Sequence, residues 1–113
     1  HSPVEASITV VEALGDLEFH LSDAEMRRRI RFLLTQPALR SSFGEALRGF
    51  EAELARQFAH RRTVGPIEAR ITAAAAMAGM LAAIEEWADA VPPRAFSEVA
   101  ADAAASLRKV LSG

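Results

Sequence analysis

Hydrophobic residues recur along this chain at the three- and four-residue spacing of α-helices, and no stretch alternates as a strand would. The first predicted helix opens at the capping box Ser2-Pro3-Val4-Glu5, and its apolar positions continue to Leu21. A second capping box, Ser22-Asp23-Ala24-Glu25, opens a short helix. Thr35-Gln36-Pro37 ends that helix, because the residue before a proline avoids the α conformation.

Three longer helices are predicted to follow, from about Ala38 to Arg61, from Pro66 to Ala90, and from near Pro93 to about Leu111. The first of these three has the most regular apolar stripe in the chain, recurring through Leu39, Phe43, Leu47, Phe50, Leu54 and Phe58. The pattern therefore predicts an all-α fold of five helices.

The fourth predicted helix has no charged residue from Ile71 to Ile84 and is rich in alanine, the strongest helix former. A helix that is apolar nearly all round must be covered on more than one side. The short turn Val91-Pro92-Pro93 indicates that the last two helices pack as an antiparallel hairpin. Two such hairpins from two chains would form a four-helix bundle about a twofold axis, whereas the alternative is a purely monomeric core.

The expected dimer interface consists of small and aliphatic residues on these last two helices. Small side chains let a partner helix approach closely, and larger aliphatic ones beside them supply buried area. The candidates are Ile71, Ala74, Ala75, Ala78, Leu81, Phe96, Val99, Ala103, Leu107 and Val110.

Composition narrows the function classes. At 113 residues the chain fits one domain. Its net charge of −2 is not the positive charge that is typical of nucleic-acid-binding domains. The chain has no cysteine, which excludes disulfides and thiolate sites. The uncharged run is expected to be too short and too alanine-rich to span a bilayer, and no signal peptide is recognisable. A cytoplasmic protein without membrane contact is the expectation.

Few residues in the sequence suggest a specific binding or catalytic chemistry. The basic cluster Arg27, Arg28, Arg29 and Arg31 is interpreted as a solvated helix face with Glu25 as a local partner, the alternative being contact with DNA or with a head domain. No exposed aromatic residue is expected among these arginines. The three histidines lack metal-ligand spacing, and no catalytic constellation is present. We therefore expect no enzyme activity, no cofactor and no metal.

The order of features resembles a known family. TQPALRSSF follows the arginine-rich helix, EALRGFEAELARQFAHR forms the long helix, and IEEWADA ends the alanine-rich helix. Gln36-Pro37-x-Leu39, Ala69-Arg70 and Trp87 are the details that carry the likeness. Over residues 3–112 the chain resembles the C-terminal regulatory domain of TetR-family transcriptional regulators, especially the actinobacterial kind related to mycofactocin-type repressors.

The resemblance implies a five-helix domain that dimerises through its last two helices and holds a small apolar effector between the others. Ligand binding in that family changes the spacing of two helix-turn-helix heads on operator DNA. Residues 1–113 form a single regulatory domain on this interpretation, with no helix-turn-helix segment among them, so we expect this chain not to bind an operator by itself. The candidate effector-binding residues are Phe19, Phe32, Phe43, Leu47, Phe50, Met77, Met80 and Trp87.

Two other interpretations stay open. The aromatic and methionine residues could be ordinary core residues rather than a pocket lining. The whole chain could also be a standalone helical-bundle interaction module that binds neither DNA nor ligand. A helix-turn-helix pattern in the upstream coding sequence would distinguish the regulator from the interaction module.

Overall fold

The computed structural model describes residues 3–14, 23–62 and 64–112, and these residues form helices and no strand. The all-α prediction is confirmed for this part of the chain. The expected first-helix positions beyond Leu14, including Leu21, lie outside the described residues, as does Phe19. In chain order the helices are α1 (Pro3–Leu14), α2 (Asp23–Thr35), α3 (Pro37–Arg62), α4 (Pro66–Asp89) and α5 (Phe96–Ser112).

The fifth helix begins later than the sequence pattern predicts. It starts at Phe96 rather than near Pro93, and the Ala95 carbonyl accepts hydrogen bonds from the backbone N–H groups of Glu98 (3.1 Å) and Val99 (3.3 Å). Residues 90–95 form the α4–α5 loop, in which the Val91–Pro92 peptide bond is cis. Two consecutive prolines keep the preceding residues out of the α conformation, so helical bonding begins only after them.

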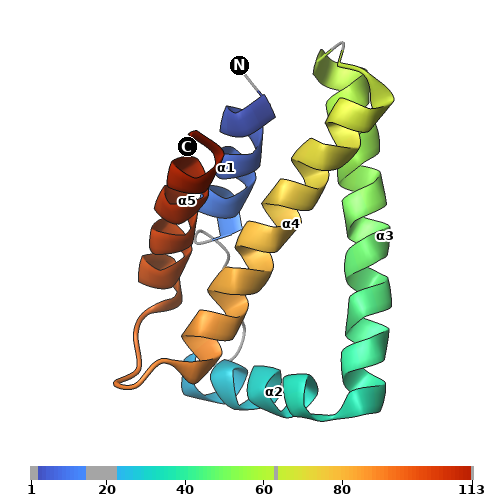
Figure 1. Cartoon of the computed structure of the whole chain (residues 1–113). Coiled ribbons are helices and arrows are strands. Elements are labelled where there is room, and N and C mark those ends of the chain that lie inside the picture. The colour runs from blue at the N-terminus through green and yellow to red at the C-terminus, as the bar shows by residue number, and fades with distance from the viewer. Residues whose placement is uncertain (1–2, 15–22, 63, 113) are drawn as a thin grey trace.

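Helix α4 is the centre of the fold, because it packs against all four other described helices. In Figure 1, α4 and α3 meet near the loop that joins them and diverge toward α2, which connects their far ends. Helices α1 and α5 lie on the other side of α4, and α5 runs antiparallel to it. The buried residues of α4 are mostly small: Ala69, Thr72, Ala73, Ala76, Met77, Gly79, Met80, Ala83, Trp87 and Ala88.

Among the described residues, α4 is also the one helix that is long and apolar enough to cross a membrane, judged by length and composition alone. Its most apolar 18-residue window has a mean hydropathy of 1.5, so the expectation that the run is too short and too alanine-rich is wrong by these two criteria. The core helix of a soluble protein passes the same test, and 44% of that window is buried inside the domain. The contacts with four neighbouring helices account for the buried part of this apolar surface, whereas Ile67 and Ile71 stay exposed.

Two apolar clusters hold the helices together. The Met cluster joins α1, α4 and α5 through buried side chains, with Leu47 of α3 packed against it. Its buried members are Ile8, Val11, Met77, Met80 and Ala104.

A buried hydrogen bond supports the same contact between α1 and α4. The Ser7 hydroxyl donates to the Thr72 carbonyl over 2.9 Å. Burying a hydroxyl without a partner is unfavourable, so this bond fixes how α1 sits against α4.

The Trp cluster lies at the other end of α4 and joins α4, α5 and α2. It consists of Ala83, Trp87, Phe96 and Val99, all buried. The rings of Trp87 and Phe96 meet edge to face, with centroids 5.1 Å apart and planes at 74°. This arrangement places the positive edge of one ring against the negative face of the other, which is favourable beyond the burial of area.

Helices α1 and α5 approach α4 closely at Gly79, beside the Met cluster. A Cβ atom built there would lie 2.8 Å from Val11 Cγ2 and 3.3 Å from Leu107 Cδ2. Val11 is fully buried and β-branched, so it has few rotamers through which to give way. Glycine at this position therefore lets α1 and α5 both reach α4.

We predict that Gly79→Ala lowers the free energy of unfolding by about 1–3 kcal/mol through overpacking, despite the better helix propensity of alanine. Gly49→Ala on α3 is the matched control, since a Cβ atom at Gly49 would meet nothing within 4 Å. The control should raise stability by about 0.5–1 kcal/mol. Urea denaturation followed by circular dichroism at one protein concentration measures both. Equal stabilisation by the two substitutions would contradict the close packing at Gly79.

Candidate functional site

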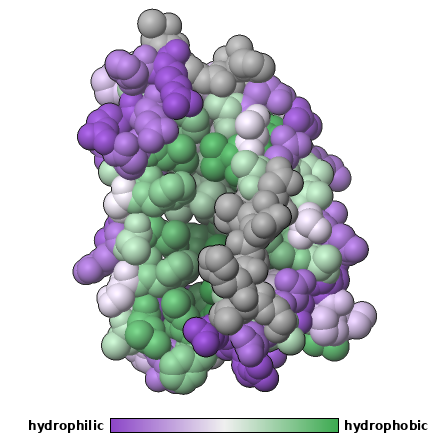
Figure 2. Space-filling model, turned by 180° about the vertical axis from the view of Figure 1, so that it is seen from behind, coloured by the Kyte–Doolittle hydropathy of each residue, from purple (hydrophilic) through white to green (hydrophobic). Residues whose placement is uncertain are grey.

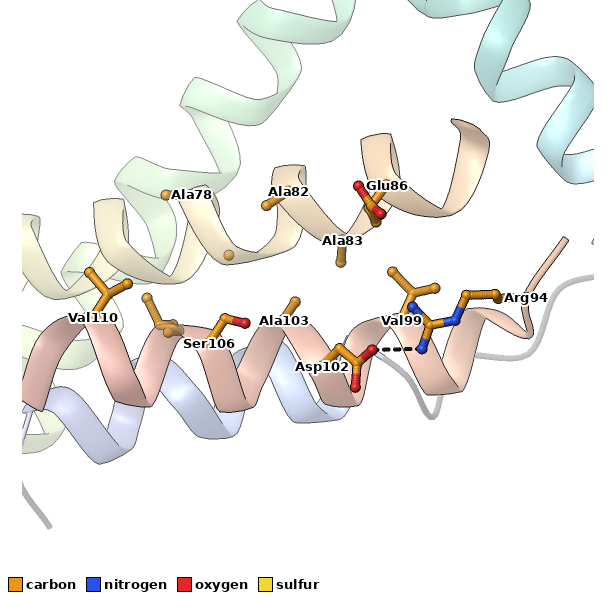
Figure 3. A pocket seen from close by; sticks show the side chains of 12 residues that line it. Ala78, Ala82, Ala83, Glu86, Arg94, Val99, Asp102, Ala103, Ser106 and Val110 are labelled. Atoms are coloured by element: carbon orange, nitrogen blue, oxygen red, sulfur yellow. Dashed lines mark hydrogen bonds and ion pairs between the residues drawn. The ribbon is translucent and has the colours of Figure 1, made fainter. Parts of the chain in front are cut away.

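An open groove of about 520 Å³ runs along the outer side of α4 and α5 (Figure 3). Alanine and glycine from α4 form one wall, and aliphatic residues of α5 form the other. The lining residues are Ala78, Gly79, Ala82, Ala83, Glu86, Arg94, Val99, Asp102, Ala103, Ser106, Leu107 and Val110.

Half of the predicted interface set lies along this groove. Its lining includes Ala78, Val99, Ala103, Leu107 and Val110. The groove floor is buried, because Val99 is only 2% exposed, whereas Val110 at its end is 75% exposed.

The remaining predicted interface residues are more scattered. Ile71 and Ala74 are exposed on α4, whereas Ala75 and Leu81 are half-buried. Phe96 is buried inside the chain against Trp87 and does not line the groove.

An exposed apolar stripe continues along α4 from the groove. Ile67 and Ile71 are 74% and 64% exposed, and Ala74, Ala78 and Ala82 follow them at helical spacing, all exposed. Ile67 was not among the predicted interface residues, although its position four residues before Ile71 places it on the same face. The stripe and the groove together form a continuous apolar surface on one side of the hairpin.

Charged residues close one end of the groove. The Arg94 guanidinium donates to Asp102 over 2.6 Å and lies 3.7 Å from the Glu98 carboxylate (Figure 3 shows the Asp102 contact). The hydrogen bond to Asp102 raises the pKa of Arg94, and the attraction of both carboxylates acts in the same direction. These ion pairs make one end of the groove polar.

The stripe on α3 is only partly covered. Ala55 is the one buried residue among the described side chains of this helix. Phe43 and Leu47 are half-buried, and Phe50 is 47% exposed. Figure 2 shows the face opposite to that of Figure 1, where hydrophobic residues gather from the upper part of the molecule to its lower edge. Among the described residues, the stripe of α3 is thus only partly covered.

The structure does not gather the other predicted effector residues into one described cavity. Met77 and Met80 are buried in the Met cluster, and Trp87 is buried in the Trp cluster. The Trp87 Nε1 donor finds no acceptor in the described part of the chain. Phe32 is 59% exposed and lines a shallow depression formed by α2 residues alone.

The arginine-rich run on α2 differs from its prediction in two ways. The expectation that no exposed aromatic residue accompanies the arginines is wrong, since Phe32 shares its depression with Arg28 and Arg29. Arg27 is not part of a solvated face. Its guanidinium is packed over the Trp87 ring, 5.1 Å from the centroid, and donates to backbone carbonyls. The pattern missed this role because a helix with four arginines in five positions does not show which one turns inward.

The described residues hold no group of three or more His, Cys, Asp or Glu side chains that could bind a metal ion. The groove and the stripes described above are apolar surfaces with ion pairs at one margin. Such surfaces bind other apolar surfaces or apolar ligands.

Comparison with protein-family models gives a match over nearly the whole chain. The family model of the MftR C-terminal domain, a TetR-type C-terminal domain, matches residues 5–112. No curated protein and no solved structure matches the chain. Because the match covers nearly the whole chain, the chain belongs to the MftR-type C-terminal domains of the TetR family of transcriptional regulators.

Proposed function

We propose that this domain joins two copies of a transcriptional repressor and senses a small apolar effector that alters how the copies are arranged. Family membership makes the domain a regulatory one. The observation that carries the proposal is the exposed, uncharged stripe from Ile67 to Ala82 beside the α4–α5 groove. A single soluble copy would leave this apolar surface in water.

A second copy of the chain is the proposed occupant of that surface. An isologous contact would place the same stripe and groove on both sides of a twofold axis. Alanine at positions 74, 78 and 82 lets a partner helix approach closely, and Val110 and Ile71 supply larger apolar area. The α4–α5 hairpins of the two copies would then form a four-helix bundle.

The proposed effector site is the incompletely covered apolar surface of α3. Phe43, Leu47 and Phe50 offer aromatic and aliphatic contacts, which are typical of small-molecule sites. The effector would act by a population shift, since a ligand that binds one helix arrangement better increases the share of that arrangement.

Operator binding belongs, on this proposal, to a helix-turn-helix domain of the full-length repressor. The domain described by residues 3–112 would set the spacing of two such heads and would not itself read base sequence. The effector-dependent shift of helix positions would reach the heads as a change in that spacing.

We predict that Ala78→Glu weakens homodimerisation by about 100-fold or more, because the substitution places like charges against each other in an apolar interface. Sedimentation equilibrium over a range of concentrations measures the Kd. The matched control is Ala52→Glu, which places the same charge at an exposed alanine of α3. A wild-type chain that stays monomeric at high concentration, or an unchanged Kd for Ala78→Glu, would contradict the proposed interface.

We also predict that the uncharged dye N-phenyl-1-naphthylamine binds the domain with a rise in fluorescence, and that Phe50→Ser weakens binding about tenfold. The half-exposed ring of Phe50 would lose its apolar contact with the dye, and fully burying such a side chain contributes about 1.5–3 kcal/mol.

Phe32→Ser serves as the control for the dye experiment. Phe32 has a similar exposure but lies in the α2 depression, so its removal should leave dye binding unchanged. Equal losses for the two variants would point to nonspecific binding and would count against a site on α3.

A further inference from the structure

The side chain of Arg27 on α2 contacts the α4–α5 hairpin at the end where the loop joins the two helices. Its Nε donates to the Trp87 carbonyl over 3.2 Å, and its Nη2 donates to the Arg94 carbonyl over 3.1 Å. The guanidinium carbon also lies 5.1 Å from the centroid of the Trp87 ring. One side chain therefore contacts both the last turn of α4, through the carbonyl and the indole of Trp87, and the α4–α5 loop.

These contacts have a clear physical basis. The Trp87 carbonyl is one of the last four of α4, which ends at Asp89, and such carbonyls have no partner within their own helix. A cation there also interacts favourably with the negative end of the helix dipole. The planar guanidinium can donate to two acceptors in fixed directions while it stacks on an aromatic ring. Arg27 thus fixes the loop relative to the end of α4.

Arg94 connects the Arg27 contact to the groove. Its carbonyl accepts from Arg27, whereas its guanidinium donates to Asp102 over 2.6 Å, and both Arg94 and Asp102 line the α4–α5 groove. A displacement of Arg27 would move the Arg94 backbone and with it the ion pair at the end of the groove. A continuous series of contacts therefore runs from α2 through Arg94 to the surface that the proposed dimer uses.

Helix α2 is well suited to move. It has no buried residue, and its apolar contact with the Trp cluster consists of the partly buried Met26 and Ile30. An element with few buried contacts shifts at lower free energy than a core helix such as α4. Arg27 adds hydrogen bonds to the Trp87 and Arg94 carbonyls to these few apolar contacts between α2 and the hairpin.

We propose that Arg27 is a positioning residue that couples the place of α2 to the geometry of the α4–α5 groove, so that movement of α2 and homodimerisation influence each other. This inference rests on the proposed function, because the groove is taken as part of the dimer interface. Arg27 does not line the groove, so any effect of its removal on dimerisation is transmitted through the hairpin. Coupling between two sites is reciprocal, so dimerisation also changes the surroundings of Trp87.

The test compares Arg27→Met with Arg28→Met in the 113-residue chain. Arg28 is the neighbouring arginine, is exposed and lines surface depressions of α2, so it controls for the loss of one positive charge on the same helix. Sedimentation equilibrium should give a Kd about tenfold higher for Arg27→Met, within the range of typical coupling between sites, and an unchanged Kd for Arg28→Met. Arg27→Lys keeps the charge but not the planar fork and should weaken dimerisation as well.

Trp87 is the only tryptophan of the chain, so its fluorescence provides a second readout that needs no substitution. Acrylamide quenching and the emission maximum of the wild-type chain should change when dilution dissociates the dimer. This measurement decides the matter if Arg27→Met does not fold, which circular dichroism would reveal.

The outcomes separate the two proposals. A wild-type chain that is monomeric at every concentration overturns the proposed dimer, and the coupling with it. A dimeric wild type whose Kd is the same in folded Arg27→Met overturns the coupling alone, as does Trp87 fluorescence that is unaffected by dissociation. Equal weakening by Arg27→Met and Arg28→Met would show an effect of net charge and would also overturn the coupling.

Discussion

The structure depends on the close packing of other helices against the small side chains of α4. Gly79 leaves room for Val11 and Leu107, and alanine at buried positions such as 73 and 76 lets neighbouring helices approach on several sides. Because side chains this small bury little area, each contact contributes modestly, and stability comes from the number of helices that share α4. The same property leaves part of α4 apolar and uncovered on its outer side.

Among the described residues, two apolar surfaces are incompletely covered, one on α4 and α5 and one on α3. The outer stripe and groove of α4 and α5 suit a second copy of the chain, and the partly exposed stripe of α3 suits a small ligand. Helix α2 connects the two surfaces through its contacts. It packs on α3 and α4, and its Arg27 donates a hydrogen bond to the α4–α5 loop. A regulatory domain needs such a connection, because an effector changes dimer geometry only if it favours one arrangement of both surfaces.

The sequence predicted the helix order and most helix bounds, because capping boxes, prolines and apolar spacing are local signals. It missed the start of α5 at Phe96, where two prolines and a loop replace a helical turn. Helical spacing predicted that Phe96 belongs to the dimer interface, whereas the structure buries its side chain against Trp87. The sequence also did not show which of the four arginines packs against Trp87. Arg27 does so because it binds carbonyls about sixty residues away. Tertiary contacts of this kind leave no periodic signal.

The chain has no cysteine, so a single introduced thiol tests the central claim directly. Ala82→Cys places a thiol in the α4–α5 groove, and Ala52→Cys places one on exposed α3. Treatment with a short bismaleimide at dilute protein concentration should give a covalent dimer for Ala82→Cys and a monomer for Ala52→Cys. Equal cross-linking of the two variants, or none in Ala82→Cys under conditions where the chain is dimeric, would contradict a dimer built on the α4–α5 surface.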